Sequence, residues 1–407
     1  MTAHPNRWVP SAYFSQALPY AMVITVSAVF YKNLQLSNDW IAFLTSWFFL
    51  PWLLKPVWAP LLEKTRSPGQ ALIFCQVACA VLCVVMMAVL LSHADAVIPL
   101  TLIVFGMMAF LSASFDMLSD AVYIKALSTQ EQQRYIGVRT FFYQVARVFC
   151  IGGVVMLVGF FAKTHNYYAA WALGFVVLAM VFVVLALWHG AQLPEVHKSA
   201  RQQEPLLAGT LAFFKQPGIV MGLLFLLLYN VGEAQVQRVL PLFLMSSHHG
   251  GGLAYSNHQV GVVFGLCGTI ALSLGALASG WCVVRWGVKR CLWWMTVVMV
   301  VANLGYILLA SAPLRWAYLA PWIIIIAQAS FGLANSAYMC VLLRLSTDKR
   351  YALTWYALAS GVMALGMMVP GMFSSILLSH FSFMVTFFFI WLMGLVSFIM
   401  LGVVRVI

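Results

Sequence analysis

The chain contains twelve apolar runs, each long enough to cross a lipid bilayer as a helix. A span takes about 20 residues, because a helix rises ~1.5 Å per residue and the hydrocarbon core is ~30 Å thick. The runs cover residues 8–31, 40–61, 70–92, 97–121, 138–162, 167–188, 218–245, 258–284, 291–311, 317–343, 351–378 and 381–404. A transmembrane barrel would show strands of about 10 residues with alternating polarity instead. The sequence therefore predicts an all-α integral membrane protein.

The composition agrees with this prediction and excludes several functions. Hydrophobic residues make up 63% of the 407 positions and charged residues 8%, whereas soluble domains have about 25% charged residues. The net charge of +12 comes from Lys and Arg dispersed in short loops, which indicates topology rather than a nucleic-acid partner. The eight cysteines show no CxxC spacing, so we expect neither a disulfide framework nor a metal site. No phosphate-binding P-loop motif occurs, and we expect no cofactor. The first run is too long for a signal peptide.

The longest polar interval, His189 to Gln216, divides the chain into halves of nearly equal length. Six plus six spans with a central polar loop are typical of a two-bundle transporter. We therefore predict an N-terminal six-helix bundle over 1–188, a cytoplasmic linker over 189–217 and a C-terminal six-helix bundle over 218–407. This pseudo-symmetric layout favours a transporter working by alternating access over a passive channel. We expect it to act as a monomer.

The basic residues predict the orientation of the spans. With the N-terminus inside, sixteen Lys and Arg fall on the cytoplasmic side, and only Lys32, Lys163 and Arg315 fall on the other side. Cytoplasmic loops are normally the ones enriched in Lys and Arg. Both termini are therefore predicted to be cytoplasmic.

Ionisable side chains inside the spans are the strongest functional candidates, because each costs several kcal/mol on insertion and needs a partner or a water-filled cavity. Near the cytoplasmic end, helical spacing predicts a cluster, whose members are Lys55, Asp116, Asp120 and Arg139. One interpretation is a structural ion-pair network that closes a cytoplasmic gate. The other makes Asp116 a proton carrier, because burial favours the protonated form of a carboxyl group and a basic neighbour favours its charged form.

Arg147 and Glu233 lie deeper, near the predicted midplane of their spans. A guanidinium stays charged and prefers carboxylate or phosphate partners, so Arg147 is predicted to contact substrate or to form a functional ion pair. Glu233 shares a polar stripe with Asn230 and Gln237 and is a candidate proton site; the alternative is an ion pair with Arg147. Arg238 is expected to reach the outer interface with its long side chain.

Two further polar stripes are candidate substrate contacts. Gln16 and Tyr20 share a face of the first span with Tyr13, and Gln328 and Asn335 nearly share a face of the tenth. The alternative is that these side chains only hold helices together. A membrane-embedded enzyme is the competing class of protein, but no His or Cys accompanies the paired acids at metal-ligand spacing. We therefore predict no catalytic residue.

The loop after the eighth span, Gly280 to Arg290, resembles the G-x3-D-R-x-G-x-[KR]-[KR] loop signature of the major facilitator superfamily. Val284 stands where that signature has its acid, which puts the charge relay of the loop in doubt. The resemblance implies two pseudo-symmetric six-helix bundles.

Several motifs resemble the AmpG-type permeases of that superfamily. Ala113–Ala121 resembles their motif A-S-Q-D-x-x-x-D-A, Leu54–Leu61 resembles F-K-F-x-W-S-P-L, Leu228–Glu233 resembles L-Y-K-x-G-D, and Thr354–Leu358 resembles T-Q-[FY]-A-L. The N-terminal segments Trp8–Pro10 and Leu18–Tyr20 also fit AmpG-like members. The resemblance implies proton-driven uptake across the inner membrane of a Gram-negative bacterium. Its cargo would be an anhydro-muropeptide from peptidoglycan. Matched position by position to the family motifs, the resemblance implies functional roles for Lys55, Asp116, Asp120 and Glu233.

Two departures from the family pattern bear on the cargo. Phe115 and Trp355 stand where the family usually has glutamine. Aromatic side chains in place of amides weaken a sugar-binding interpretation and suit an aromatic ligand. The extra C-terminal helix pair of the longer muropeptide permeases is also expected to be missing. We take a muropeptide as the first expectation and a ferric siderophore, the cargo associated with related shorter permeases, as the second.

Overall fold

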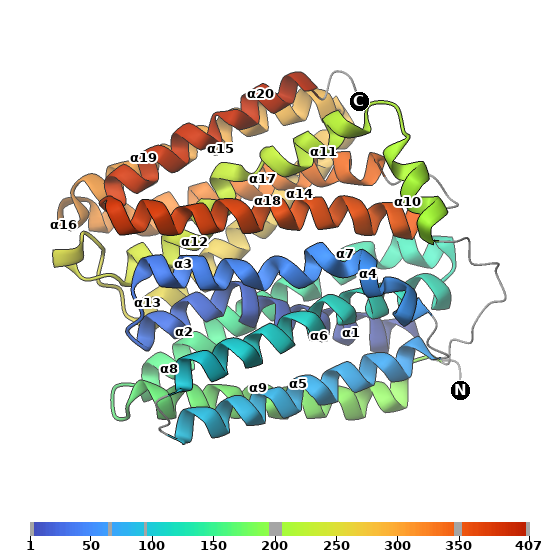
Figure 1. The fold of residues 1–407 in the computed structure, drawn as a ribbon, viewed down its shortest axis with the longest axis horizontal. Helices are drawn as coiled ribbons and strands as arrows, with labels where there is room; N and C mark the ends of the chain where they lie inside the picture. Colours follow the sequence, from blue (N-terminus) through green and yellow to red (C-terminus); the bar gives the residue numbers. More distant parts are fainter. Residues whose placement is uncertain (1–3, 64–66, 93–95, 195–205, 346–351, 404–407) are drawn as a thin grey trace. The chain divides into compact units, whose positions relative to one another are not determined.

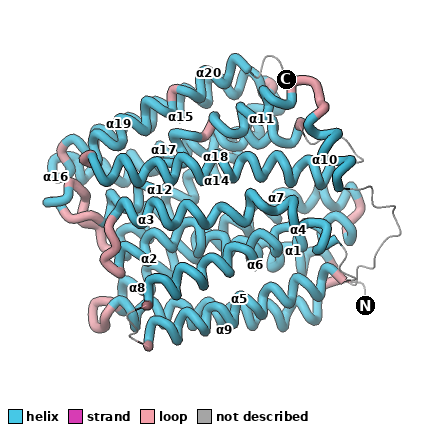
Figure 2. Tube along the Cα trace, in the orientation of Figure 1, coloured by secondary structure: helices cyan, strands magenta, loops and turns pink. Residues whose placement is uncertain are grey.

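The computed structural model describes residues 4–63, 67–92, 96–194, 206–345 and 352–403. Within these ranges every regular element is a helix (Figure 2). Among the described residues, twelve helical segments are long and apolar enough to cross a membrane, and each coincides with a predicted apolar run to within a few residues. The predicted all-α fold with twelve spans is therefore confirmed.

Contacts divide the chain into two compact units, of which the first comprises Met1–Leu34 and Val57–Gln202. Its helices are α1 (Pro5–Ala21), α2 (Ser27–Asn33), the end of α4 (Leu50–Glu63), α5 (Pro68–Leu91), α6 (Val97–Ala126), α7 (Thr129–Arg147), α8 (Val155–Phe161) and α9 (Tyr167–Gln192). In this unit α1 packs against α6 and α7, and α5 packs against α6 and α9.

The second unit comprises Gln35–Pro56 and Gln203–Ile407. Its helices are α3 (Asn38–Ser46), the start of α4 (Leu50–Glu63), α10 (Leu206–Phe214), α11 (Ile219–Leu228), α12 (Val231–Met245), α13 (Asn257–Val260), α14 (Thr269–Trp286), α15 (Val288–Ser311), α16 (Pro313–Trp316), α17 (Ala320–Arg344), α18 (Ala352–His380), α19 (Phe383–Gly394) and α20 (Val396–Val403). The second span, by its contacts, thus begins in this unit, with α3 lying along α18 (Figure 1). The bundle limits at 188 and 218 stay a prediction, and residues 195–205 of the expected linker lie outside the described ranges.

Helix contacts in the second unit repeat those of the first. The pairs α1–α7, α5–α6 and α5–α9 of the first unit correspond to α12–α18, α15–α17 and α15–α19 of the second, six spans later. Such repetition is expected where two related six-helix halves carry the same packing faces.

Several spans are interrupted where a regular helix would continue. Wider π-helical turns occur in the first span at Met22–Val26, in the fifth at Val148–Val154 and in the eighth at Gly261–Gly268. The seventh span is divided into α11 and α12 by a turn at Tyr229 and Asn230. Interruptions of this kind are common at functional sites of helical proteins, and the sequence did not predict them.

The break in the seventh span is stabilised by side chains from other helices. Tyr338 donates its hydroxyl hydrogen to the Leu226 carbonyl at 2.7 Å, and Ser397 donates to the Tyr229 carbonyl at 2.5 Å. Backbone groups in a membrane must be satisfied within the protein, so these two hydroxyls replace hydrogen bonds that the break removes. A Cβ atom on Gly232 would lie 2.7 Å from the Gly394 Cα, which is too close. Glycine therefore permits the contact between α12 and α19.

The loop that resembles the superfamily signature forms a tight turn between α14 and α15. Gly287 has φ 78°, in the left-handed region that favours glycine. Val284 is 90% exposed, and the Arg285 guanidinium lies 5.4 Å from the Trp281 ring. The loop thus keeps the glycine turn of the signature, while its arginine contacts an aromatic ring.

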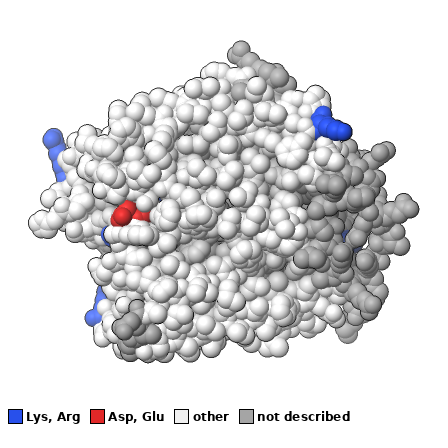
Figure 3. Space-filling view, viewed as in Figure 1, with Lys and Arg blue, Asp and Glu red and all other residues white. Residues whose placement is uncertain are grey.

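The exposed surface of the spans is mostly uncharged. On the face shown in Figure 3, Lys, Arg, Asp and Glu side chains lie toward the ends of the helices. Large apolar side chains are exposed along the spans, such as Leu187 at 72% and Ile399 at 67%. Exposed apolar side chains of this kind are suited to contact with lipid.

Candidate functional site

In the first unit, α1 directs polar side chains toward the two acids of α6. Tyr13 donates its hydroxyl hydrogen to Asp120 Oδ1 at 2.8 Å, and the Gln16 amide donates to Asp116 Oδ1. Tyr13 and Gln16 are about one helical turn apart on α1, as Asp116 and Asp120 are on α6. Two neighbouring hydrogen bonds can therefore form along the interface between these helices. Both acids of the predicted cluster therefore have hydrogen-bond donors on the first span.

Arg139 of α7 completes the arrangement around Asp120. Its guanidinium forms an ion pair with Asp120 Oδ1 at 3.1 Å and lies over the rings of Tyr13 and Tyr123, at 4.6 and 5.6 Å. The two charged side chains are 33% and 22% exposed, so solvent screens part of their attraction. The structure thus brings together two members of the predicted charge cluster.

Lys55, another predicted member of that cluster, is a buried residue of α4. Its contacts assign it to the second unit, whereas Asp116, Asp120 and Arg139 belong to the first. A position of Lys55 beside these acids therefore stays a prediction.

The remaining candidates of the first unit have different environments. The Tyr20 ring lies 6.1 Å from the ring of Tyr143. Arg147 is half-buried, and its Nη1 donates to Gln144 Oε1 at 3.5 Å. Its Nε is buried and has no hydrogen-bond partner among the residues that the structure describes. Phe115 is fully buried within the apolar core of the unit.

In the second unit, Glu233 lies in the first turn of α12 and is only 4% exposed. Gln237 donates to its Oε1 at 2.8 Å and Asn303 to its Oε2 at 3.1 Å. Gln237 also approaches Gln328 Oε1 at 3.4 Å. Within the described ranges no Lys, Arg or His forms an ion pair with Glu233. The carboxylate is therefore surrounded by neutral amides and by the N-terminus of a helix, which favours negative charge.

The amide stripe continues to the break in the seventh span. Asn230 Nδ2 donates to Asn335 Oδ1 at 3.3 Å, while Asn230 Oδ1 is buried and has no partner in the described part of the chain. Gln237, Asn303 and Gln328 thus form one hydrogen-bonded group with Glu233, and Asn230 and Asn335 form a second amide pair at the break.

Two other residues are engaged within the second unit. Trp355 is buried, donates its indole hydrogen to the Gly209 carbonyl at 3.0 Å, and packs against Phe213 of α10. Arg238 is 4% exposed, donates to the Thr45 carbonyl at 3.0 Å and lies 5.0 Å from the Phe49 ring. The expectation that Arg238 reaches the interface is wrong, because its guanidinium is used to hold the second span against α12.

Sequence reasoning missed two parts of this polar interior. Asn303 is an isolated amide in an apolar run, and a polar residue at such a place was itself a signal. The other part is a buried network in the first unit, in which His189 lies 2.9 Å from Ser11 Oγ and 2.6 Å from the Gln76 amide. Both depend on which helix faces meet, which one sequence does not reveal.

The family model of the Major Facilitator Superfamily matches residues 11–353. The chain belongs to this superfamily. It is similar to a Rickettsia conorii protein named "Putative transporter AmpG 4", with 23% identity over 86% of this chain and 84% of that protein. Its fold is similar to that of a variant of the nucleoside transporter NupG, with TM-score 0.74, 13% identity and coverage of 98% and 99%. A D-xylose–proton symporter gives TM-score 0.72, 14% identity and coverage of 97% and 95%.

Membership of the superfamily confirms several predictions. The chain is a multi-pass membrane transporter with the major facilitator fold and bacterial relatives, and not an enzyme. The resemblance to AmpG-type permeases is confirmed by relatives that bear this name. The structural likenesses show the fold alone.

Proposed function

We propose that this transporter imports an anhydro-muropeptide together with protons across the inner membrane of a Gram-negative bacterium. Both termini would be cytoplasmic, and the protein would work as a monomer. The superfamily and its alternating-access fold are the basis of this proposal. Individual side chains support its finer parts, the proton and the cargo.

The environment of Glu233 is the observation that carries the proposal. A coupling site must change its charge during transport, and intramembrane acids are the usual proton relays. Glu233 is buried, accepts hydrogen bonds from Gln237 and Asn303, and has no ion-pair partner among the residues of the described ranges. Proton uptake would neutralise a charge that is costly to bury.

The acids of the first unit have a different proposed role. Asp120 is paired with Arg139, and this ion pair, with Asp116 and Lys55, is proposed as a cytoplasmic gate. Asp116 accepts a hydrogen bond from Gln16 and is the second candidate for proton coupling.

The polar side chains favour a sugar–peptide cargo. Asn230, Gln237, Gln328 and Asn335 offer amide donors and acceptors of the kind that hydroxyl and amide groups bind, and Asn230 Oδ1 is left without a partner among the described residues. The orphaned Nε of Arg147 suits a peptide carboxylate.

The two aromatic departures argue less strongly for an aromatic ligand than the sequence suggested. Phe115 is buried in the core of its unit, and Trp355 is held by Gly209 and Phe213. Both aromatic side chains therefore have a packing role in the structure described. A ferric siderophore remains the second candidate cargo, because it is the cargo associated with related shorter permeases.

Uptake into energised membrane vesicles tests the proposal. Radiolabelled anhydro-muropeptide and an aromatic ferric siderophore are compared, each with and without a protonophore. We expect the muropeptide to accumulate against its gradient and the protonophore to abolish this accumulation. Accumulation of the siderophore alone would show that the siderophore, and not the muropeptide, is the cargo. Accumulation that resists the protonophore would exclude proton coupling.

A further inference from the structure

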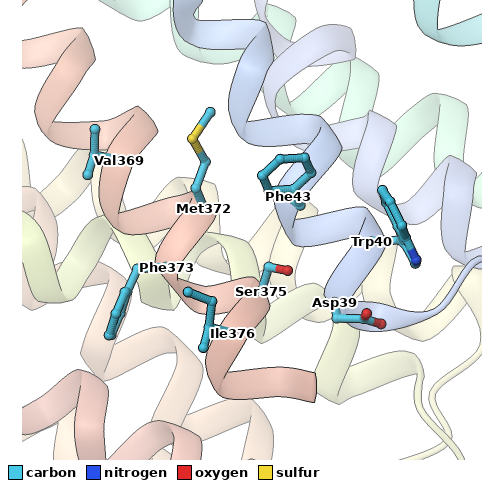
Figure 4. A pocket seen from close by; sticks show the side chains of 8 residues that line it. All are labelled: Asp39, Trp40, Phe43, Val369, Met372, Phe373, Ser375 and Ile376. Carbon is cyan, nitrogen blue, oxygen red and sulfur yellow. The ribbon is translucent and has the colours of Figure 1, made fainter. Parts of the chain in front are cut away.

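A groove opens between α3 and α18, away from the polar residues of the candidate site. It has a volume of about 550 Å³. Its lining residues are Asp39, Trp40, Phe43, Val369, Met372, Phe373, Ser375 and Ile376. Figure 4 shows that the first three come from α3 and the others from α18. All belong to the second unit.

The walls of this groove are apolar and open to the surroundings. Trp40, Val369 and Ile376 are 56%, 51% and 54% exposed. Both helices belong to segments long and apolar enough to span a membrane, so we expect these exposed side chains to face lipid rather than water. From Ile376 to Val369 the groove follows α18 for about 10 Å, at ~1.5 Å per residue.

Asp39 is the exception in this apolar lining. It lies in the first turn of α3, is half-buried, and forms no ion pair with any described residue. Its neighbour Trp40 is exposed, as tryptophans at the level of lipid headgroups commonly are. Ser375 adds a hydroxyl on the opposite wall, and Figure 4 shows it pointing toward α3. The groove therefore joins a carboxylate at its end to an apolar channel.

The packing of α3 on α18 holds the two walls apart at a fixed spacing. A Cβ atom on Gly371 would collide with Ser46 Oγ, so the helices touch directly below the groove. Near its end, Asn38 Nδ2 donates to Ser246 Oγ at 3.1 Å, which fixes the start of α3 on the residue after α12. Helix α3 is therefore held by side-chain contacts, at its end with α18 and at its start with the residue after α12.

We propose that the groove binds one phospholipid with a primary ammonium headgroup, of the phosphatidylethanolamine type. The ammonium group would donate hydrogen bonds to Asp39 and Ser375, and one acyl chain would lie against Phe43, Met372 and Val369. A net anionic headgroup would be repelled by Asp39, and the quaternary ammonium of phosphatidylcholine has no N–H to donate. The predicted orientation places the site in the outer leaflet. The proposal is independent of the cargo and of proton coupling.

Native mass spectrometry of the full chain released from nanodiscs tests this proposal. The nanodiscs contain equal amounts of dioleoyl phosphatidylethanolamine and dioleoyl phosphatidylcholine. We expect one retained lipid per chain and a preference for phosphatidylethanolamine of about fivefold, the size of an exposed ion pair. Asp39→Asn should reduce this preference to about one, and Asp39→Glu should retain it.

A second variant tests the apolar channel. Val369→Trp places an indole in the groove and should abolish lipid retention. The matched control is Val184→Trp, at a 64% exposed position of α9, which should retain lipid as the unchanged chain does. Circular dichroism and melting temperature check that each variant is folded.

Several outcomes would overturn the proposal. These are absence of retained lipid, equal retention of the two lipids, an unchanged preference in Asp39→Asn, or retention that survives Val369→Trp. A preference for phosphatidylglycerol in a separate mixture would show that the groove takes an anionic lipid. A dimer that Val369→Trp dissociates would show that a second copy of the chain covers the groove instead.

Discussion

The two units hold their intramembrane acids in opposite ways. In the first unit, Asp120 has a cationic partner in Arg139 and a phenol donor in Tyr13, and its side chain is 22% exposed. In the second unit, Glu233 is almost completely buried and its hydrogen-bond donors are neutral amides. A paired acid keeps its charge when its partner stays close, whereas an unpaired buried acid gains most from binding a proton. This contrast suggests a gate in the first unit and coupling in the second.

The interrupted first spans of the two halves differ as well. The first span of the chain accommodates its irregular stretch with a π-helical turn, Met22–Val26, and remains continuous. The seventh span breaks at Tyr229 and Asn230, and hydroxyls from α17 and α20 donate to the Leu226 and Tyr229 carbonyls at the break. The break starts a new helix N-terminus one turn before Glu233. The second unit therefore combines its buried acid with a discontinuous helix, and the first unit does not.

The largest expected effect follows from removing the charge of Glu233. Glu233→Gln should reduce accumulation of solute by about 100-fold, the size expected for losing a proton-transfer group. Exchange of solute down its gradient should continue, because the Gln237 donor still has an acceptor and the Asn303 amide can rotate to provide one. Radiolabelled uptake and counterflow in vesicles distinguish the two processes.

The corresponding variant of the first unit tests whether the proton-coupling site lies there instead. Asp116→Asn keeps an acceptor for Gln16 and should retain at least part of the accumulation if coupling lies in the second unit. If Asp116→Asn abolishes accumulation while Glu233→Gln does not, the coupling site lies in the first unit. If both variants still concentrate solute, neither acid is the coupling site.

The next effect tests the close contact between α12 and α19, which follows the break in the seventh span. Gly232→Ala would place a Cβ 2.7 Å from the Gly394 Cα and 3.1 Å from the Ile390 carbonyl oxygen. Because backbone atoms cannot move aside as side chains do, we expect destabilisation of about 1–3 kcal/mol. The matched control is Gly394→Ala, since a Cβ there meets no atom within 4 Å. Unfolding in a denaturing detergent measures both, and equal stability of the two variants would contradict the tight crossing.

A smaller effect is expected from the Asp120–Arg139 ion pair of the first unit. Asp120→Asn and Arg139→Gln, combined in a double-mutant cycle, should give a coupling energy of about 0.5–1 kcal/mol, because the pair is partly exposed. The control cycle combines Arg139→Gln with Glu131→Gln, which should show no coupling. A coupling energy above about 3 kcal/mol would mean that the ion pair is desolvated, as Glu233 is.

The smallest effect concerns the helix caps of the two units. In the first unit, hydrogen bonds from the Ser128 backbone N–H and hydroxyl lower the pKa of Glu131 at the start of α7. A lowered pKa in the folded state means that the cap stabilises above the unfolded-state pKa and that this stabilisation is lost as pH falls through the folded-state pKa. The difference in melting temperature between the unchanged chain and Glu131→Gln should therefore vanish on acidification.

The second unit supplies a matched control for this cap. Ser256 and Gln259 form the same capping box at the start of α13 without a charge. Gln259→Glu should raise the melting temperature at neutral pH and introduce the same loss in acid. Scanning fluorimetry between about pH 7 and pH 3 measures both variants. An unchanged pH profile of Glu131→Gln would contradict the role of the carboxylate.

The amino-acid sequence by itself predicted the twelve spans and the helix faces of the polar residues. Length and hydropathy decide a span locally, because each helix satisfies its own backbone hydrogen bonds in lipid. The spacing of Asp116 and Asp120, and of Tyr13 and Gln16, likewise follows from helical periodicity.

The tertiary structure alone decided which faces meet. It brought Asn303 within hydrogen-bond distance of Glu233, brought Trp355 within hydrogen-bond distance of the Gly209 carbonyl, and packed α3 along α18. It also decided where spans are interrupted, because the break before α12 depends on hydroxyls from Tyr338 and Ser397 that are more than 100 residues away. Close packing between distant segments cannot be read from local patterns, since many helix pairings are compatible with the same apolar surface.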